Sequence, residues 1–224
     1  MTPPAICIKD LEKSYNGTRA LNGVSLEIGD GQFFGLLGPN GAGKTTTINI
    51  LSGLVLKDSG KTEVFGRDTV KEYRTTRAKI GIAAQELSQD WFFPIETLLY
   101  FQAGYYGITR KKAEPNIERL LGRLGLTEKR EARLRQLSGG MKRRYQLAKA
   151  LVHDPKIVIL DEPTAGVDVE FRHDMWKLFR ELHGEGKTIL LTTHYIEEAE
   201  MLCEDVAIID AGKIIARGKP EDMT

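Results

Sequence analysis

The chain has 224 residues, carries a formal net charge of +1 and contains 28% charged and 41% hydrophobic residues. That length accommodates one large domain, or a domain with a subdomain. The near-neutral charge argues against nucleic-acid binding, because proteins of that class present a basic surface. No apolar run approaches the roughly 20 residues that cross a bilayer. We interpret Cys7 and Cys203, which lie far apart, as buried reduced thiols rather than metal ligands.

Short strands and turns are predicted from residue 5 to residue 35. Val24–Ile28 alternates between apolar and polar residues, as a half-buried strand does, and Asn16-Gly17 is a turn signal. We expect two or three short strands here, forming a small antiparallel sheet laid against the rest of the domain. Tyr15 can stack on a nucleobase, an interaction worth about 1–3 kcal/mol, although its place beside a turn favours an ordinary sheet aromatic.

A glycine-rich loop stands between an apolar run, Phe33–Leu37, and a helical pattern, Thr46–Leu56. Its glycines let successive backbone N–H groups turn inward as an anion nest, and the following helix adds unpaired N–H groups and a positive dipole end. The lysine can reach outer phosphates and the threonine hydroxyl can bind Mg²⁺. The sequence therefore predicts a phosphate-binding P-loop, made of Gly38, Pro39, Asn40, Gly41, Ala42, Gly43, Lys44 and Thr45.

The pattern then changes from mixed to mainly helical. Lys79–Ala84 is predicted to be a buried strand that ends at Gln85, and the carboxyl end of such a strand is where ligands bind in open α/β sheets. Helical patterns follow at residues 96–106, 115–125 and 138–152. We therefore expect a helical subdomain over residues 87–152, inserted between residues 1–86 and 153–224 of an α/β core.

The last of these helices opens with two glycines. Ser138 can cap it, and Gly139 and Gly140 expose backbone N–H groups, which makes a second anion site about ninety residues after the first. One nucleotide rarely needs two nests in one domain, so two copies facing head to tail could each lend this nest to the other's nucleotide. Taken alone, a well-capped helix is the simpler interpretation. Lys142 and Arg143 are expected on a solvated face of the helix.

Adjacent acids, Asp161 and Glu162, follow the continuous apolar run Ile157–Leu160. Downstream of a P-loop, the first acid can hold Mg²⁺ through water and the second can orient or deprotonate an attacking water. The alternative is a helix N-cap, worth about 1 kcal/mol. His194 ends the buried strand Thr188–Thr193, where it would face the same crevice and hydrogen-bond a γ-phosphate.

These motifs, in this order, resemble those of the nucleotide-binding subunit of an ATP-binding-cassette (ABC) transporter over essentially the whole chain. They are the P-loop as Walker A, Gln85 as the Q-loop, Leu137–Met141 as the signature, Ile157–Asp161 as Walker B, Ala165–Asp168 as the D-loop and His194 as the switch histidine. The resemblance implies an α/β P-loop NTPase fold, with a RecA-like core, an N-terminal antiparallel β-subdomain and an inserted α-helical subdomain.

The resemblance also implies roles in binding Mg²⁺ and ATP. Tyr15 becomes the adenine-stacking aromatic. Residues 40–46, which include Thr46, would cradle the phosphates, with Lys44 on the β and γ groups. Mg²⁺ would be bound by Thr45 and Gln85, and by Asp161 through water.

The implied chemistry at the γ-phosphate needs groups from two copies of the chain. Glu162 would act as general base and His194 would contact the γ-phosphate. Asp168 would link the two sites of a nucleotide-dependent homodimer, and Ser138, Gly139 and Gly140 would clasp the partner's nucleotide. ATP binding would close the dimer and hydrolysis would reopen it.

The resemblance further implies an integral membrane permease as partner, which would hold the chain on the cytoplasmic face of the membrane. Gln85 would couple the two. Trp91–Ile95 either lines the groove for a coupling helix of the permease or belongs to the core.

The motifs also indicate a branch of the family. The signature ends in Met141, where many members have Gln, and Tyr195–Glu200 follows the switch histidine. With the D-loop Gly166-Val167-Asp168, this looks like the exporter branch that handles drugs, lipids or polysaccharides. We therefore expect the ATPase subunit of an exporter. The alternative is a non-transport member acting on ribosomes or DNA, although the sequence shows no long coiled-coil insertion or basic extension.

Overall fold

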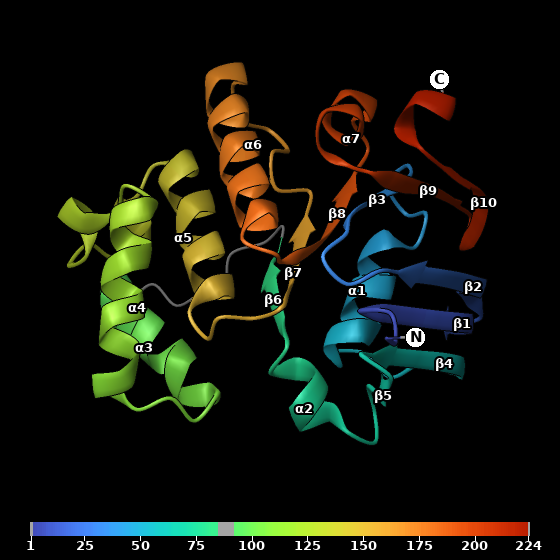
Figure 1. The fold of residues 1–224 in the computed structure, drawn as a ribbon, viewed down its shortest axis with the longest axis horizontal. Coiled ribbons are helices and arrows are strands. Elements are labelled where there is room, and N and C mark those ends of the chain that lie inside the picture. The colour runs from blue at the N-terminus through green and yellow to red at the C-terminus, as the bar shows by residue number, and fades with distance from the viewer. Residues whose placement is uncertain (1, 85–91, 224) are drawn as a thin grey trace.

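The computed structural model describes residues 2–84 and 92–223, which fold into two sheets and a group of helices (Figure 1). The central sheet has the strand order β10-β9-β3-β8-β7-β6. All neighbouring strands pair in parallel except β10, which runs antiparallel to β9 and forms a hairpin with it at the sheet edge. The strands are β3 (Phe33–Leu37), β6 (Ile80–Ala83), β7 (Ile157–Asp161), β8 (Thr188–Thr193), β9 (Asp205–Asp210) and β10 (Lys213–Gly218).

The second sheet is antiparallel, with the order β2-β1-β4-β5. Asn16 and Gly17 connect its first two strands with φ values of 47° and 82°, as the turn signal predicted. The prediction of a sheet built from strands before residue 38 was incomplete, because β4 and β5 come after the glycine-rich loop. The strands are β1 (Ile6–Tyr15), β2 (Thr18–Ile28), β4 (Ser59–Val64) and β5 (Arg67–Asp68).

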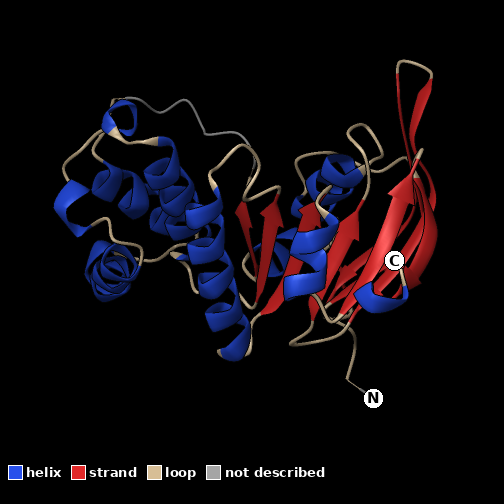
Figure 2. Ribbon diagram, turned by 90° about the horizontal axis from the view of Figure 1, so that it is seen from above, coloured by secondary structure: helices blue, strands red, loops and turns tan. Residues whose placement is uncertain are grey.

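The helices gather mainly at the end of the molecule away from the antiparallel sheet (Figure 2). There α3, α4 and α5 pack on one another, and α5 also packs against β6. These three helices lie within residues 87–152, the segment for which a helical subdomain was predicted. The helices are α1 (Lys44–Ser52), α2 (Tyr73–Arg77), α3 (Ile95–Tyr105), α4 (Arg110–Arg123), α5 (Gly139–Leu151), α6 (Val169–Gly184) and α7 (Ile196–Leu202).

Two helix boundaries differ from the prediction. Helix α1 ends at Ser52 rather than Leu56, because Gly53 takes a left-handed conformation (φ 72°) and caps the last turn. Helix α4 begins at Arg110, before the predicted start at Pro115. Proline normally breaks a helix interior, but here buried residues on both sides of it, including Ala113 and Ile117, hold the helix together.

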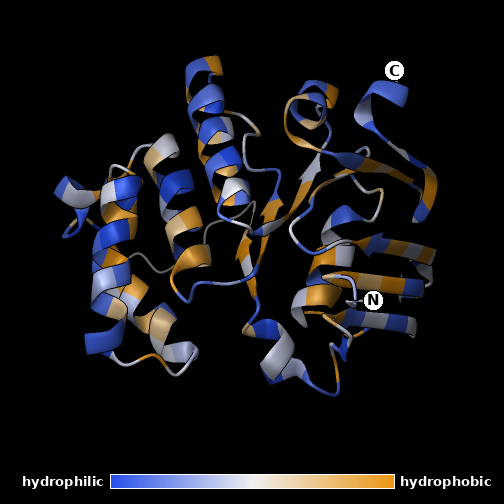
Figure 3. Cartoon of the chain, in the orientation of Figure 1, coloured by the Kyte–Doolittle hydropathy of each residue, from blue (hydrophilic) through white to orange (hydrophobic). Residues whose placement is uncertain are grey.

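Two hydrophobic clusters lie on the two faces of the central sheet. Neighbouring strand residues point to opposite faces, so Phe33 packs with α5 and α6, whereas Phe34 packs with α1 and the antiparallel sheet. The apolar residues accordingly concentrate in the strands and on the inward faces of the helices (Figure 3). Within the described ranges, no helix combines the length and apolar character needed to span a membrane.

Candidate active site

The glycine-rich loop runs from the end of β3 to the start of α1 and is held by close backbone approaches. Gly43 has a left-handed φ of 112°, and a Cβ there would lie 2.7 Å from Leu21 Cδ2 and 2.9 Å from the Ala20 carbonyl oxygen. On another side, the N–H of Gly212 in the β9–β10 turn donates to the Ala42 carbonyl at 2.9 Å. Only glycine fits at position 43, both for its φ and for the space around it.

The loop borders a pocket of about 280 Å³ at the N-terminus of α1. A helix N-terminus with inward-facing loop N–H groups favours an anion. The pocket therefore brings the predicted phosphate cradle and the predicted general base around one space. Its lining residues are Ala20, Pro39, Asn40, Gly41, Gly43, Lys44, Thr45, Thr46 and Glu162.

An ammonium, a carboxylate and an imidazole stand in line at this pocket. Lys44 Nζ donates to the carbonyls of Gly38 (2.6 Å) and Pro39 (3.1 Å) and lies 3.3 Å from Glu162 Oε1. The other carboxylate oxygen, Oε2, is 3.4 Å from His194 Nδ1. The side chains of Lys44 and Glu162 are only 5% and 7% exposed. The structure thus joins three residues that the sequence predicted to share one crevice.

The backbone of Glu162 is in an unusual conformation. Its φ is 47°, in the left-handed region that costs a non-glycine residue about 1–2 kcal/mol. The Glu162 N–H donates to the Thr192 carbonyl at 3.0 Å, which ties this conformation to β8. Strain of this kind persists where the surroundings enforce it, and it concentrates at functional sites.

Asp161, at the end of β7, is buried beside two hydroxyls. Its Oδ1 accepts from Thr192 Oγ1 at 2.6 Å, and its Oδ2 is 3.5 Å from Thr45 Oγ1. Burial raises the pKa of Asp161 above its usual range and the charge of Glu162 adds to this, while the Thr192 hydrogen bond opposes it. A divalent cation beside these oxygens would favour the ionised carboxylate, so the donor set fits Mg²⁺.

Thr192 was missed by the sequence reasoning. It pairs in register with Asp161 across β7 and β8, and no local motif marks it. Only the strand register would have revealed it.

The second predicted anion site begins α5. Ser138 caps this helix by accepting a hydrogen bond from the Met141 N–H at 3.3 Å, as predicted. Ser138 and Gly139 are exposed. Neither they nor Gly140 line the pocket at the glycine-rich loop. Within one chain, the two predicted anion sites are therefore separate.

The segment after Glu162 leads to a second capped helix. Asp168 Oδ1 accepts from the Phe171 N–H at 2.8 Å and so caps α6. Arg143 reaches this segment, donating to the Ala165 carbonyl at 3.4 Å. The expectation of a solvated face was wrong for Arg143, which is half-buried. Burial lowers the pKa of its guanidinium, while the negative charge of Glu162 acts in the opposite direction.

Of the other predicted nucleotide-binding residues, Tyr15 stands apart from this geometry. Tyr15, at the end of β1, is 43% exposed, with Lys13 Nζ 5.4 Å from its ring centroid. It does not line the pocket, and its stacking role stays a prediction. Gln85 lies outside the described residues, as does Trp91. The roles given to Gln85 stay predictions as well.

A mainly parallel sheet, a glycine-rich loop leading into a lysine-bearing helix, and an acid pair ending a nearby strand define a P-loop nucleotide-binding protein. The family model described as "ABC transporter" matches residues 21–165, and the chain belongs to this family.

Curated relatives agree with this assignment. The chain is 43% identical over 223 residues to the Nod factor export ATP-binding protein I of Rhizobium johnstonii, covering 100% of this chain and 72% of the relative. It is 42% identical over 223 residues to the protein of the same name from Paraburkholderia xenovorans, covering 100% of this chain and 73% of the relative. These matches confirm the prediction of an ATP-binding and ATP-hydrolysing subunit of an ABC exporter.

Solved structures confirm the predicted fold. An ATP-binding subunit of an ABC transporter superposes with a TM-score of 0.88 at 27% identity, over 98% of this chain and 91% of that one. The cbiO1 protein of Clostridium perfringens, part of the ABC transporter complex cbiONQ, superposes with a TM-score of 0.86 at 29% identity, over 99% of this chain and 90% of that one.

Proposed function

We propose that the chain binds and hydrolyses ATP at two sites shared between the copies of a head-to-tail homodimer. The observation that carries the proposal is the separation of the two anion sites within one chain. The pocket at the loop Gly38–Thr45 is lined by Lys44 and Glu162, whereas the N-terminus of α5 has only a capped, glycine-lined backbone. A second copy turned head to tail would place the N-terminus of its α5 at the pocket of the first copy. Two-fold symmetry would place the α5 of the first copy at the pocket of the second in the same way.

Each pocket residue then has one task. Lys44 exchanges its carbonyl contacts for the β- and γ-phosphate oxygens, and Thr46 supports them from the first turn of α1. Glu162 accepts a proton from the water that attacks the γ-phosphorus, and His194, beside it at 3.4 Å, donates to a γ-phosphate oxygen. The products are ADP and inorganic phosphate.

Mg²⁺ belongs with the nucleotide at this site. Thr45 and Asp161 are the described residues that would hold it, Asp161 through water, and Gln85 is proposed as a further ligand. Among the described residues no group of three or more His, Cys, Asp or Glu gathers around one point. This agrees with Mg²⁺, which usually keeps several waters and binds to one or two protein oxygens and to phosphates. The ion would neutralise charge developing on the β- and γ-phosphates.

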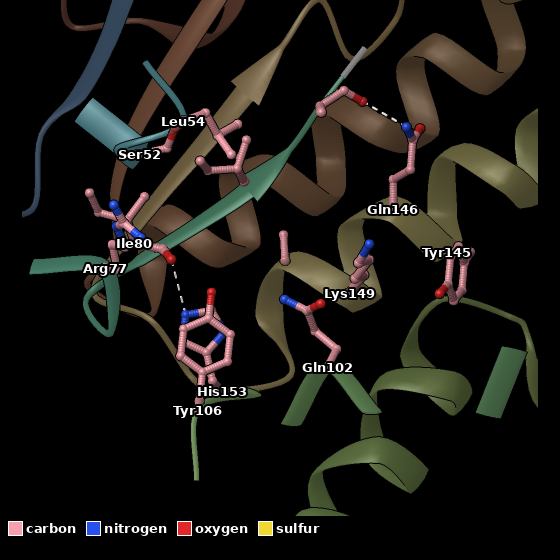
Figure 4. Close-up of a pocket in the computed structure, with 13 residues that line it drawn as sticks. Ser52, Leu54, Arg77, Ile80, Gln102, Tyr106, Tyr145, Gln146, Lys149 and His153 are labelled. Atoms are coloured by element: carbon pink, nitrogen blue, oxygen red, sulfur yellow. Dashed lines mark hydrogen bonds between the residues drawn. The ribbon is translucent and has the colours of Figure 1, made fainter. Parts of the chain in front are cut away.

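A groove of about 580 Å³ between β6, α3 and α5 is our proposed docking site for the permease (Figure 4). Leu54 lines it and is 77% exposed, and the rings of Tyr106 and His153, which also line it, stack with their centroids 3.6 Å apart. Exposed apolar surface of this kind marks interaction sites. Arg77 and Lys149 add positive charge, and the lining contains no acid: Ser52, Leu54, Arg77, Ile80, Ile82, Ala84, Gln102, Tyr106, Tyr145, Gln146, Lys149, Ala150 and His153.

Residues 92–95 were predicted either to line a groove for the permease or to belong to the core, and individual residues of the segment suit different roles. Phe92 is 77% and Phe93 44% exposed, whereas Ile95 is fully buried. The two phenylalanines are thus available to a partner, and the isoleucine belongs to the core.

The relatives named for Nod factor export support a substrate of that kind, within the predicted range of drugs, lipids or polysaccharides. Substrate selectivity would reside in the permease, and the chain would work at the cytoplasmic face of the membrane beneath it.

A mixed-dimer experiment tests the shared sites. We would combine a Lys44→Ala chain with a Gly139→Asp chain carrying a different tag, and measure ATPase activity and heterodimer formation. In a mixed dimer one composite site lacks both elements and the other keeps both. With random pairing and independent sites, about a quarter of wild-type activity should return, while either variant alone stays inactive.

Gly122→Asp is the matched control. Gly122 lies on α4 and an added Cβ there meets nothing within 4 Å, so this variant should keep full activity. Heterodimers that form with ATP but hydrolyse no faster than either variant alone would contradict independent shared sites.

A further inference from the structure

A glutamate is buried behind the candidate active site. Glu198, on α7 four residues after His194, is only 1% exposed. Its Oε1 accepts hydrogen bonds from Thr164 Oγ1 at 2.8 Å and from Trp176 Nε1 at 3.1 Å. Its Oε2 has no hydrogen-bond partner among the described residues. A carboxylate this deeply buried is costly, so packing alone does not account for it.

One of the two donors belongs to the segment that connects the general base to the D-loop. Thr164 is fully buried and lies two residues after Glu162 and four before Asp168. The backbone contacts inside this turn are long, with Ala165 N–H to the Glu162 carbonyl at 3.2 Å and Val167 N–H to the Thr164 carbonyl at 3.4 Å. The side-chain hydrogen bond from Thr164 to Glu198 is shorter than either, and it ties the turn to another element.

The other donor comes from the body of the protein. Trp176 is nearly fully buried on α6, the helix that Asp168 caps. A single carboxylate oxygen thus accepts from the D-loop segment and from α6 at once. Because both hydrogen bonds are buried, where they are stronger than in water, this oxygen fixes the turn at 163–168 relative to the helix that follows His194.

We propose that Glu198 is a positioning residue for ATP hydrolysis, which holds the D-loop segment through Thr164. It does not line the pocket at the glycine-rich loop. Its effect would reach the reaction through the placement of Glu162 and of Asp168, and for Asp168 the inference rests on the shared-site proposal above.

Two substitutions separate positioning from plain stability. Thr164→Val keeps the side-chain shape and removes the donor on the D-loop segment. Trp176→Phe removes the other donor to the same oxygen and also loses more buried volume, so it is the harsher change to the fold. A merely structural Glu198 predicts that Trp176→Phe is the more damaging variant in every assay.

The expected result is the opposite order in catalysis. Thr164→Val in the full chain should lower kcat about tenfold or more, because small misplacements of reacting groups are expensive in rate, while the Kd for ATP stays within about twofold. Trp176→Phe should lower the melting temperature further but keep kcat within about threefold below its transition. Glu198→Gln, which retains an acceptor oxygen, should keep kcat close to that of Trp176→Phe, and Glu198→Ala should match Thr164→Val.

Equal kcat values for Thr164→Val and Trp176→Phe, or a Glu198→Gln variant as slow as Glu198→Ala, would overturn the assignment. A second measurement distinguishes this failure from that of the shared-site model. In a Glu162→Gln background, light scattering should show an ATP-dependent dimer, and adding Thr164→Val should raise the ATP concentration for half-dimerisation, whereas Trp176→Phe should not. If Glu162→Gln alone forms no such dimer, the shared-site model fails. If it dimerises and Thr164→Val changes nothing, the positioning role fails.

Discussion

Replacing Glu162 by Gln removes the proposed base and leaves the side-chain shape intact. General-base catalysis contributes about 10²–10⁴-fold, so kcat should fall by a hundredfold or more, about 3 kcal/mol at the barrier. ATP binding should survive. The carboxylate lies 3.3 Å from Lys44 and 3.4 Å from His194 inside the pocket, where its negative charge also opposes that of the γ-phosphate. Removing the charge should either leave the Kd for ATP unchanged or lower it, so that ATP binds at least as tightly as before.

The same substitution has a second expected effect. Lys44 and Glu162 are both almost fully buried, and breaking such a pair from one side is destabilising because it leaves an uncompensated charge. Without nucleotide the Glu162→Gln chain should therefore melt at a lower temperature than the wild type, and saturating ATP should restore much of the difference by supplying negative charge to Lys44.

The assay is phosphate release at saturating ATP and Mg²⁺, beside equilibrium binding of a fluorescent ATP analogue. Glu200→Gln makes the same chemical change on the exposed side of α7 and should alter neither kcat nor the melting temperature. A Glu162→Gln chain with kcat within a few-fold of the wild type would remove this residue from the base role.

Three further variants test separate parts of the site. Asp161→Asn should abolish Mg²⁺-dependent turnover yet raise the melting temperature without nucleotide at pH 7. Because the pKa of Asp161 is raised, the folded chain binds more protons than the unfolded chain between about pH 4 and that pKa. The contribution of Asp161 to the free energy of unfolding therefore falls as the pH rises through this window. Melting temperatures measured across the window should depend less on pH in the variant than in the wild type. Gly43→Ala should weaken ATP binding about tenfold or more in a fluorescence titration, since its Cβ would press on Leu21 and the Ala20 carbonyl; unchanged binding would refute the argument. Leu54→Asp should leave the ATPase of the purified chain unchanged and its stability within about 0.5 kcal/mol, but reduce co-purification of a membrane subunit, and retention of that subunit would exclude this groove.

Local patterns were sufficient for the central strands and the glycine-rich loop. Each buried strand carries its own apolar run, and the loop needs glycine for reasons that act within a few residues, so the sequence determines both without knowledge of the partner elements. The antiparallel sheet was only half visible. Its strands β1 and β4 pair across the whole loop and α1, and nothing near Ser59–Val64 in the chain identifies that pairing.

Burial explains what the sequence could not show of the site. Arg143 follows two glycines among other basic residues, which is the pattern of a solvated helix face, yet its guanidinium turns toward the Ala165 carbonyl. Glu198 stands in an acidic run, 197–200, that looks fully exposed, yet it is buried while Glu197 and Glu200 are not. The helical register of α7 decides which acid turns inward, and that register depends on where the preceding strand ends.

The contacts of Lys44 connect nucleotide binding to the availability of the base. Its ammonium lies within reach of the Gly38 and Pro39 carbonyls and of the Glu162 carboxylate. Phosphate oxygens at the loop compete with the two carbonyls because they are charged acceptors and the carbonyls are not, and they compete with the carboxylate because they offer the ammonium several negative oxygens at once. An ammonium drawn to the phosphates gives up its 3.3 Å contact with Glu162 Oε1, so the carboxylate is released to face the attacking water. Glu162 is therefore freed from its ion pair as ATP is engaged, at the step in which its carboxylate is needed. A Lys44→Arg chain would retain the charge but not this compact point contact, and its ATP affinity should fall less than its kcat. An equal loss in both would show that ATP binding and the release of Glu162 are not linked through this residue.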